Sequence, residues 1–221
     1  MNAKNRVAVL LSGNGSNLQA MLDQQPDYSY DIVCVISNRP DAFGLERAKA
    51  ANIPAIALDH KAAPSRQVFE DTLIAHIERF APDWIILAGY MRILSADFVA
   101  RFARRLINIH PSLLPDYKGL RTHQRVLGDG QKKHGASVHF VTAELDSGAI
   151  IVQASLMIEV NDTETSLCQR VQAMEHKIYP MAVDFLTSGR LTFLGDQLWL
   201  DSDPLDQKGY QVNEQQLLAS P

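Results

Sequence analysis

The stretch RVAVLLSGNGSNLQA, residues 6–20, decides the fold class of this chain. Its first six residues form an almost entirely apolar run, which is typical of a strand buried on both faces. A glycine-rich turn follows at once, and a helical segment begins near Ser16. A buried strand that leads through a tight turn into a helix is the first half of a β-α-β unit, and such units build parallel sheets.

The same order of apolar run and helical segment repeats up to residue 110. In the segment 65–80, Phe69, Leu73, Ile77 and Phe80 recur at helical spacing. This rhythm predicts an α/β fold with a mostly parallel central sheet and helices on both faces. Further strands are expected over 31–37, 54–58, 83–89 and 106–110, and helices over 44–52, 65–80 and 95–105, the last with Ser95 as its N-cap.

The rhythm changes after residue 111. Residues 111–134 contain five prolines and glycines and no sustained periodicity, which predicts a long loop that acts as a lid or mobile segment. Two apolar runs follow, 136–141 and 149–160, joined by TAELDSG. They predict an antiparallel hairpin at the C-terminal edge of the sheet.

The rest of the chain is expected to form one long helix over 162–186 and a polar tail. Pro180 should kink or divide that helix. We predict one domain over 1–195 and a tail over 196–221 that packs on the surface. The helix should bury the stripe Leu167, Val171, Met174 and Ile178.

Composition argues against several classes of function. Hydrophobic residues make up 46% of the 221 residues, enough for a sizeable core, and the net charge is −4. That charge does not suit a nucleic-acid backbone as partner. No apolar stretch approaches a signal peptide or a membrane span, so we expect a cytoplasmic protein without a membrane partner. Cys34 and Cys168 form no CxxC pattern and are expected to be buried, reduced and inert.

The turn SGNGSN, residues 12–17, is the first candidate for chemistry. Main-chain N–H groups and the dipole of the following helix converge there, which favours a phosphate. The turn lacks the Gly-Lys-Ser/Thr ending of a P-loop, and Leu18 stands where a dinucleotide fingerprint needs its third glycine. An ordinary tight turn with an N-cap is therefore an equally open alternative.

Asn108 and His110 are the second candidate, because Pro111 ends their strand. Side chains alternate along a strand, so both point to one face, at the strand end where parallel sheets bind ligands. A buried Asn–His network is the alternative. Asp146 in ELDSG is the third candidate, although an Asx-turn would also explain it.

Two other classes of site are not supported. The histidines, among them His110, His123, His134, His139 and His176, show no metal-ligand spacing, so we expect scattered histidines and no metal. No GxSxG turn occurs, which argues against a serine hydrolase.

Several motifs together resemble the folate-dependent phosphoribosylglycinamide formyltransferase family. The motifs are SGNGSNLQA, LAGYMRIL, NIHPSLLP, GASVHFVTAELDSG and QRVQAMEHKIYP, which occur in order over nearly the whole chain. HPSLLP marks the wider group of formyl-folate transferases and hydrolases. SGNGSN narrows the resemblance from that group to the enzymes that act on glycinamide ribonucleotide. The resemblance implies a Rossmann-like formyltransferase fold over 1–195 and formyl transfer from 10-formyltetrahydrofolate to the amine of a phosphoribosyl glycinamide in purine synthesis.

The resemblance also implies roles for individual residues. Asn108, His110 and Asp146 match the catalytic residues, and 111–133 matches a mobile loop. The family's phosphate-binding turn corresponds to Gly15, Ser16 and Asn17. The residues near the glycinamide end of the substrate correspond to Gln172 and Glu175. The folate pocket corresponds to Arg66, Met91, Arg92, Ile93, Leu94, Asn108, Thr142, Ala143, Glu144, Leu145 and Asp146.

This chemistry is consistent with the residues themselves. Formyl transfer between amines passes through a tetrahedral oxyanion, which Asn108 and a protonated His110 could stabilise. Asp146 could favour the imidazolium and relay protons through water. No metal or redox cofactor is needed, and we expect a monomer or homodimer that binds only small molecules. The open alternatives are a formyltetrahydrofolate hydrolase, another formyl-folate transferase, and a non-catalytic nucleotide-binding module.

Overall fold

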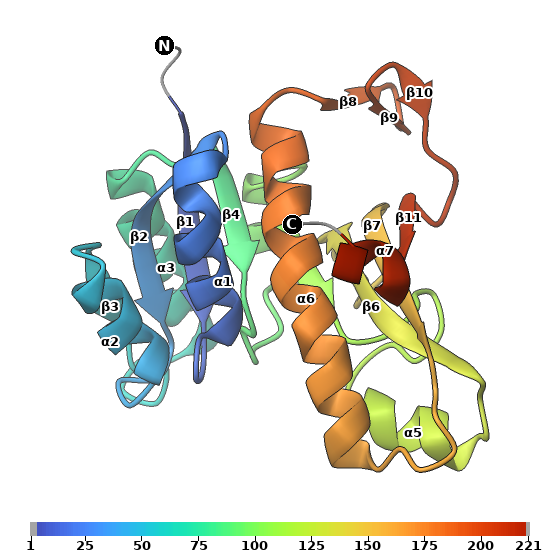
Figure 1. Cartoon of the computed structure of the whole chain (residues 1–221). Helices are drawn as coiled ribbons and strands as arrows, with labels where there is room; N and C mark the ends of the chain where they lie inside the picture. The colour runs from blue at the N-terminus through green and yellow to red at the C-terminus, as the bar shows by residue number, and fades with distance from the viewer. Residues whose placement is uncertain (1–3, 220–221) are drawn as a thin grey trace. The chain divides into compact units, whose positions relative to one another are not determined.

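The computed structural model describes residues 4–219 and divides the chain into two compact units, Met1–Asn108 and Ile109–Pro221 (Figure 1). The boundary falls within β5 (Leu106–His110). The division into a catalytic domain and a tail at residue 195 stays a prediction. Within residues 4–219, no helix combines the length and the apolar character that crossing a bilayer requires.

The first unit is built on a parallel sheet with strand order β5, β4, β1, β2, β3. Val9 of β1 lies between Val35 of β2 and Ile86 of β4, and all three are buried. Because the central strands are covered on both faces, apolar residues occupy successive positions along them. The strands are β1 (Asn5–Leu11), β2 (Tyr30–Ser37), β3 (Ala55–Ala57), β4 (Trp84–Leu87) and β5.

Helices cover both faces of this sheet, as predicted. α1 lies in front of the sheet and contacts α2, whereas α3 lies behind it (Figure 1). The change of face follows from right-handed crossovers, because the chain builds outward from β1 to β3 and then returns to β4 on the other side of β1. The helices are α1 (Ser16–Gln24), the 3₁₀ turn η1 (Gln25–Asp27), α2 (Phe43–Ala50), α3 (Arg66–Arg79) and α4 (Ala96–Arg101).

Serine caps set the starts of two of these helices. The Ser65 and Ser95 side chains accept hydrogen bonds from the N–H groups of Val68 and Phe98, which confirms Ser95 as an N-cap. α4 is shorter than the predicted helix over 95–105. It ends at Arg101, and Arg104 has a left-handed φ of 60° that no helix accommodates.

The second unit contains the predicted antiparallel hairpin, β6 (Lys133–Phe140) and β7 (Ile150–Met157). α6 (Glu164–Thr187) packs on both strands and buries the predicted stripe of apolar residues. The expected division at Pro180 is wrong, because α6 continues through it as one helix. Cys168 on α6 is exposed, which corrects the expectation that both cysteines are buried.

Two features of this unit were not predicted from the sequence. α5 (Thr122–Gly128) interrupts the 111–134 loop, and β11 (Tyr210–Asn213) pairs in parallel with β7, so β7 is not an edge strand. The predicted surface tail is thus partly regular. It contains β9 (Gln197–Leu200), β10 (Asp203–Pro204), β11 and α7 (Glu214–Ala219), and β8 (Leu191–Leu194) precedes it.

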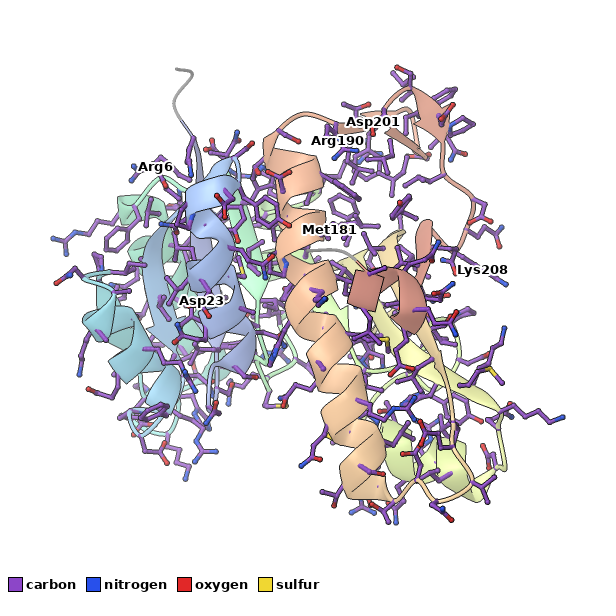
Figure 2. All side chains as sticks on the ribbon, in the orientation of Figure 1. Arg6, Asp23, Met181, Arg190, Asp201 and Lys208 are labelled. Atoms are coloured by element: carbon purple, nitrogen blue, oxygen red, sulfur yellow. The ribbon has the colours of Figure 1, made fainter. Side chains whose placement is uncertain are left out.

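Strands β8, β9 and β10 form a separate antiparallel sheet. A bidentate ion pair joins its two sides, because the Arg190 guanidinium donates to both carboxylate oxygens of Asp201, at 2.9 and 2.5 Å (Figure 2). Both side chains are about half exposed, so solvent screens the pair and it adds little to stability.

Candidate active site

His110 and Asp146, which the sequence could not place relative to each other, are neighbours in the second unit. The Nδ1 atom of His110 lies 3.4 Å from Oδ2 of Asp146, and each side chain is less than a tenth exposed. Nε2 of His110 lies 3.0 Å from the carbonyl oxygen of Tyr117. A carbonyl oxygen only accepts, so Nε2 carries a hydrogen there. With a second hydrogen on Nδ1, the imidazole and the carboxylate form a buried ion pair.

The Asp146 carboxylate has two further neighbours. Its Oδ2 accepts a hydrogen bond from the N–H of Gly119 at 3.0 Å, and its Oδ1 lies 3.7 Å from Nε2 of His139. Asp146 itself has a left-handed φ of 46°, which aspartate tolerates better than most residues. The carboxylate therefore lies between the imidazoles of His110 and His139. The Gly119 N–H of the 111–133 loop holds it in place, and the β6–β7 connection carries it.

A second pair of imidazoles lies close by. Nδ1 of His123 is 2.9 Å from Nε2 of His134, so one nitrogen of the pair donates and the other accepts. His110 perturbs the titration of His123, His134 and His139 alike. The expectation of scattered histidines is therefore wrong, because four of the seven gather in the second unit.

Burial keeps three of these histidines neutral. The pKa of His134 is lowered to about 4, chiefly by burial and also by the nearby His123 and His110. Burial also lowers the pKa of His123 and of His139, although the Phe140 carbonyl and Asp146 act in the opposite direction on His139. Among these four, His110 is the imidazole that faces the carboxylate through Nδ1 and the loop through Nε2.

The loop after His110 is anchored at its beginning. The Ser137 hydroxyl donates to the carbonyl of Ser112 at 2.7 Å and accepts from the N–H of Leu114 at 3.1 Å. The Gln153 side chain donates to the carbonyl of Leu114 at 3.0 Å. These buried contacts fix residues 112–114 to the hairpin, while the motion of the rest of 111–133 stays a prediction.

Asn108 closes the first unit on β5, where it pairs with Leu87. It lies two residues before His110 on the same strand, so the pleat points both side chains to one face, as predicted. Ile107 and Ile109 are buried on the other face. The arrangement matches the expected polar strand end.

The predicted phosphate turn lies at the start of α1. Gly15 has a left-handed φ of 75°, and a Cβ there would lie 2.7 Å from the Cα of Gly44, so only glycine fits. The Gly44 N–H donates to the Gly13 carbonyl at 3.1 Å, and the Arg47 guanidinium donates to the main-chain and side-chain oxygens of Asn14 at 2.9 and 3.0 Å. Gly15 is the N-cap residue of α1 and makes no side-chain cap hydrogen bond.

The predicted folate segment, Met91–Leu94, follows β4 in the same unit. Met91 and Ile93 are about 70% exposed, unusually so for large apolar side chains. The Arg66 guanidinium donates to the Ile93 carbonyl at 2.8 Å and to the Glu70 carboxylate at 3.0 Å. Glu70 is buried and accepts from the N–H and hydroxyl of Ser95. Arg92 stacks over Phe69, so Arg66 and Arg92 both brace this segment.

The remaining predicted residues lie in the second unit. Residues 142–145 form the exposed β6–β7 connection, in which the Thr142 hydroxyl donates to the Glu144 carbonyl and Lys118 contacts Glu144 and Ser147. Gln172 and Glu175 lie one helical turn apart on α6, the first exposed and the second buried.

Three residues that contact Asp146 or His110 were not predicted from the sequence: His139, Gly119 and Tyr117. His139 left a signal, because alternation along 133–140 places Ser137 and His139 on one face. Gly119 and Tyr117 left none, since their contacts depend on the path of an irregular loop. Among residues 4–219, no group of three or more His, Cys, Asp or Glu side chains could hold a metal ion.

Comparisons with known proteins agree with this geometry. Residues 5–183 match the model of the formyl transferase family. Phosphoribosylglycinamide formyltransferase of Escherichia coli (strain K12) is 47% identical over 210 residues, which cover 94% of this chain and 99% of that protein. The human trifunctional purine biosynthetic protein adenosine-3 is 43% identical over 84% of this chain, which spans 19% of that protein.

Solved structures lead to the same family. The phosphoribosylglycinamide formyltransferase of Coxiella burnetii superposes with a TM-score of 0.90 at 47% identity, covering 94% of this chain and 99% of that one. Glycinamide ribonucleotide transformylase 1 of Symbiobacterium toebii superposes with a TM-score of 0.86 at 40% identity, covering 90% of this chain and 95% of that one. The α/β fold with its mostly parallel sheet is that of these enzymes, and the chain belongs to the formyl transferase family.

Proposed function

We propose that this formyltransferase moves a formyl group from 10-formyltetrahydrofolate to the amine of N1-(5-phospho-β-D-ribosyl)glycinamide, a step of purine biosynthesis. The observation that carries the proposal is the buried His110–Asp146 pair, 3.4 Å apart, in a chain 47% identical to a phosphoribosylglycinamide formyltransferase over 94% of its length. A formyltetrahydrofolate hydrolase is not favoured, because the relatives named above are transferases or purine biosynthetic proteins.

In the proposed reaction, the amine nitrogen attacks the formyl carbon and forms a tetrahedral oxyanion. The bond from that carbon to N10 of the folate then breaks, and the proton lost by the amine ends on N10. Asn108 and His110 donate hydrogen bonds to the oxyanion, and each such donor is worth about 10²–10³ in rate. The Nε2–H of His110 here donates to the Tyr117 carbonyl, and the formyl oxygen replaces that acceptor.

Asp146 orients His110 and assists the proton transfer. Its carboxylate faces Nδ1 of His110, and the Gly119 N–H holds it in place. A carboxylate in this position can pass the proton from the amine to N10 through a water molecule, a contribution of about 10²–10⁴.

The acceptor's phosphate binds the turn Gly15, Ser16 and Asn17. Two features support this: the left-handed φ of Gly15, and the dipole of the nine-residue α1, which starts in this turn. Gln172 and Glu175 of α6 bind the glycinamide end. Binding energy from the remote phosphate then orients the amine toward the formyl carbon.

The folate binds main-chain groups of Met91, Arg92, Ile93 and Leu94, with Arg66, Asn108 and the connection Thr142, Ala143, Glu144, Leu145 and Asp146. The exposed side chains of Met91 and Ile93 support this assignment, since a flat aromatic ring would cover them. The reaction needs no metal. A monomer or homodimer and a cytoplasmic location remain predictions from the sequence.

One assay tests the proposal. Purified protein, with a chelator present, should convert the substrate pair to formylated glycinamide ribonucleotide and tetrahydrofolate in equal amounts. Omission of the acceptor should stop tetrahydrofolate production. Release of formate at an undiminished rate without the acceptor would instead identify a hydrolase, and a folded protein inactive toward the pair would refute the proposal.

A further inference from the structure

The Ser12 side chain joins two segments that the proposed function assigns to different substrates. It follows β1 directly, is 2% exposed, and stands three residues before Gly15, the first residue of the phosphate turn. Its hydroxyl accepts from the N–H of Met91 at 2.8 Å, and its own N–H donates to the Gly89 carbonyl at 3.1 Å. One residue thus connects the start of the acceptor's turn to the start of the donor's segment.

The direction of the Ser12 O–H bond is fixed by Asn38, at the end of a third strand, β2. The Ser12 O–H donates to Oδ1 of Asn38 at 2.5 Å, and Asn38, directly after β2, is 3% exposed. Nδ1 of His60 lies 2.7 Å from the Asn38 carbonyl oxygen, so it donates to that carbonyl and holds Asn38 in place. The Ser12 hydroxyl therefore donates its hydrogen to Asn38 and accepts with a lone pair from the Met91 N–H.

We propose that Ser12 is a positioning residue, which rests on the proposed function: its hydroxyl fixes the phosphate turn and the folate segment Met91–Leu94 relative to each other. Both segments bind their substrates through main-chain groups. Their position relative to each other therefore decides how close the amine comes to the formyl carbon. A shift of about 1 Å between reacting groups is enough to reduce the rate strongly. Ser12 touches neither substrate and acts only through the two segments.

Replacement of the hydroxyl should affect both substrates at once. In Ser12→Ala the Met91 N–H and the Asn38 Oδ1 lose their buried partner, and the two segments lose their common support. We expect the KM values for the acceptor and for the folate to rise together, each by roughly fivefold to tenfold. Recovery of both values in Ser12→Thr, which restores a hydroxyl, would support the proposal.

Ser37→Ala is the matched control. Ser37 is fully buried at the carboxyl end of neighbouring β2, and its hydroxyl donates to the Arg39 carbonyl at 2.9 Å and accepts from the Arg39 N–H at 3.1 Å. It makes the same kind of contacts but joins neither segment, so both KM values should stay within about twofold of wild type. An increase in only one KM in Ser12→Ala, or equal increases in Ser37→Ala, would overturn the proposal.

Amide hydrogen exchange separates this proposal from the proposed function. The Met91 amide should exchange at least tenfold faster in Ser12→Ala than in wild type or in Ser37→Ala, whatever the substrate. Inactivity of the wild type toward the substrate pair would defeat the proposed function and leave this measurement intact. Unchanged protection of the Met91 amide in a folded Ser12→Ala variant would defeat the role of Ser12.

Discussion

The turn after β1 and the connection after β6 differ in which polar groups they present: main-chain groups in the turn, side chains in the connection. The turn in the first unit offers main-chain N–H groups, and its side chains, such as Arg47, hold the backbone. In the second unit, the ionisable side chains of His110, His139 and Asp146 face one another, and main-chain groups such as the Gly119 N–H hold them. Main-chain groups suit binding of a fixed charge, whereas side chains that exchange protons suit chemistry. Substitutions in the two regions should therefore affect different kinetic constants.

His110→Ala should have the largest effect and tests this comparison most severely. Loss of a donor to the oxyanion and of the partner of Asp146 should reduce kcat by about 10²–10³. Both KM values should change less than about fivefold. Steady-state kinetics with each substrate varied in turn provides the measurement. His76→Ala, a half-buried histidine on α3, is the control and should leave kcat unchanged. Turnover of His110→Ala within tenfold of wild type would contradict the role of the imidazole.

Gly15→Ala should show the converse pattern. The new Cβ meets the Gly44 backbone at 2.7 Å, and alanine resists the φ of 75°, so the turn must shift. We expect the acceptor KM to rise at least tenfold, a nearly constant folate KM, and a loss of about 1–3 kcal/mol in the free energy of unfolding.

Gly189→Ala controls for backbone strain alone. Gly189 has a φ of 77° after α6, and a Cβ there has no neighbour within 4 Å. This variant should lose about 1 kcal/mol of stability and keep both KM values. If both variants raise the acceptor KM equally, the proposed phosphate turn is not the cause.

The elements that the sequence predicted well are those with a local cause. β1 and β4 are apolar on both faces because they are buried on both faces, and the alternation along 106–110 in β5 correctly placed Asn108 and His110. The proximity of Asp146 was not predictable, because it depends on contacts between segments 36 residues apart in the chain. The same holds for the histidine cluster. α5 was missed because it has seven residues and no side-chain cap, and β11 because its four residues pair with a distant strand.

The buried histidines should make the stability of the protein sensitive to acid. The pKa of His134 is about 4 in the folded state and near 6.5 when unfolded, so the unfolded state binds more protons between these values. Stability from this group is therefore complete above pH 6.5 and is lost as the pH falls toward 4. In His134→Gln this loss is absent.

Urea unfolding at several pH values measures this effect. The difference in free energy of unfolding between wild type and His134→Gln should shrink between pH 7.5 and 5. A constant difference for His134→Gln would show that its imidazole is not held neutral by burial.

Arg66→Ala should have the smallest effect and sharpens the comparison most. The Arg66 side chain is half exposed and holds the folate segment at the Ile93 carbonyl, and in the variant Glu70 keeps its two bonds to Ser95. The folate KM should rise about threefold to tenfold with kcat unchanged, since an exposed hydrogen bond to a charged group is worth about 1 kcal/mol. Arg101→Ala removes a comparable ion pair, with Glu78, that touches no proposed substrate segment, and it should change neither constant. A fall in kcat for Arg66→Ala would mean that Arg66, like Asn108, takes part in the chemistry, and the separation between the folate segment, which binds, and the side chains that transfer protons would no longer hold.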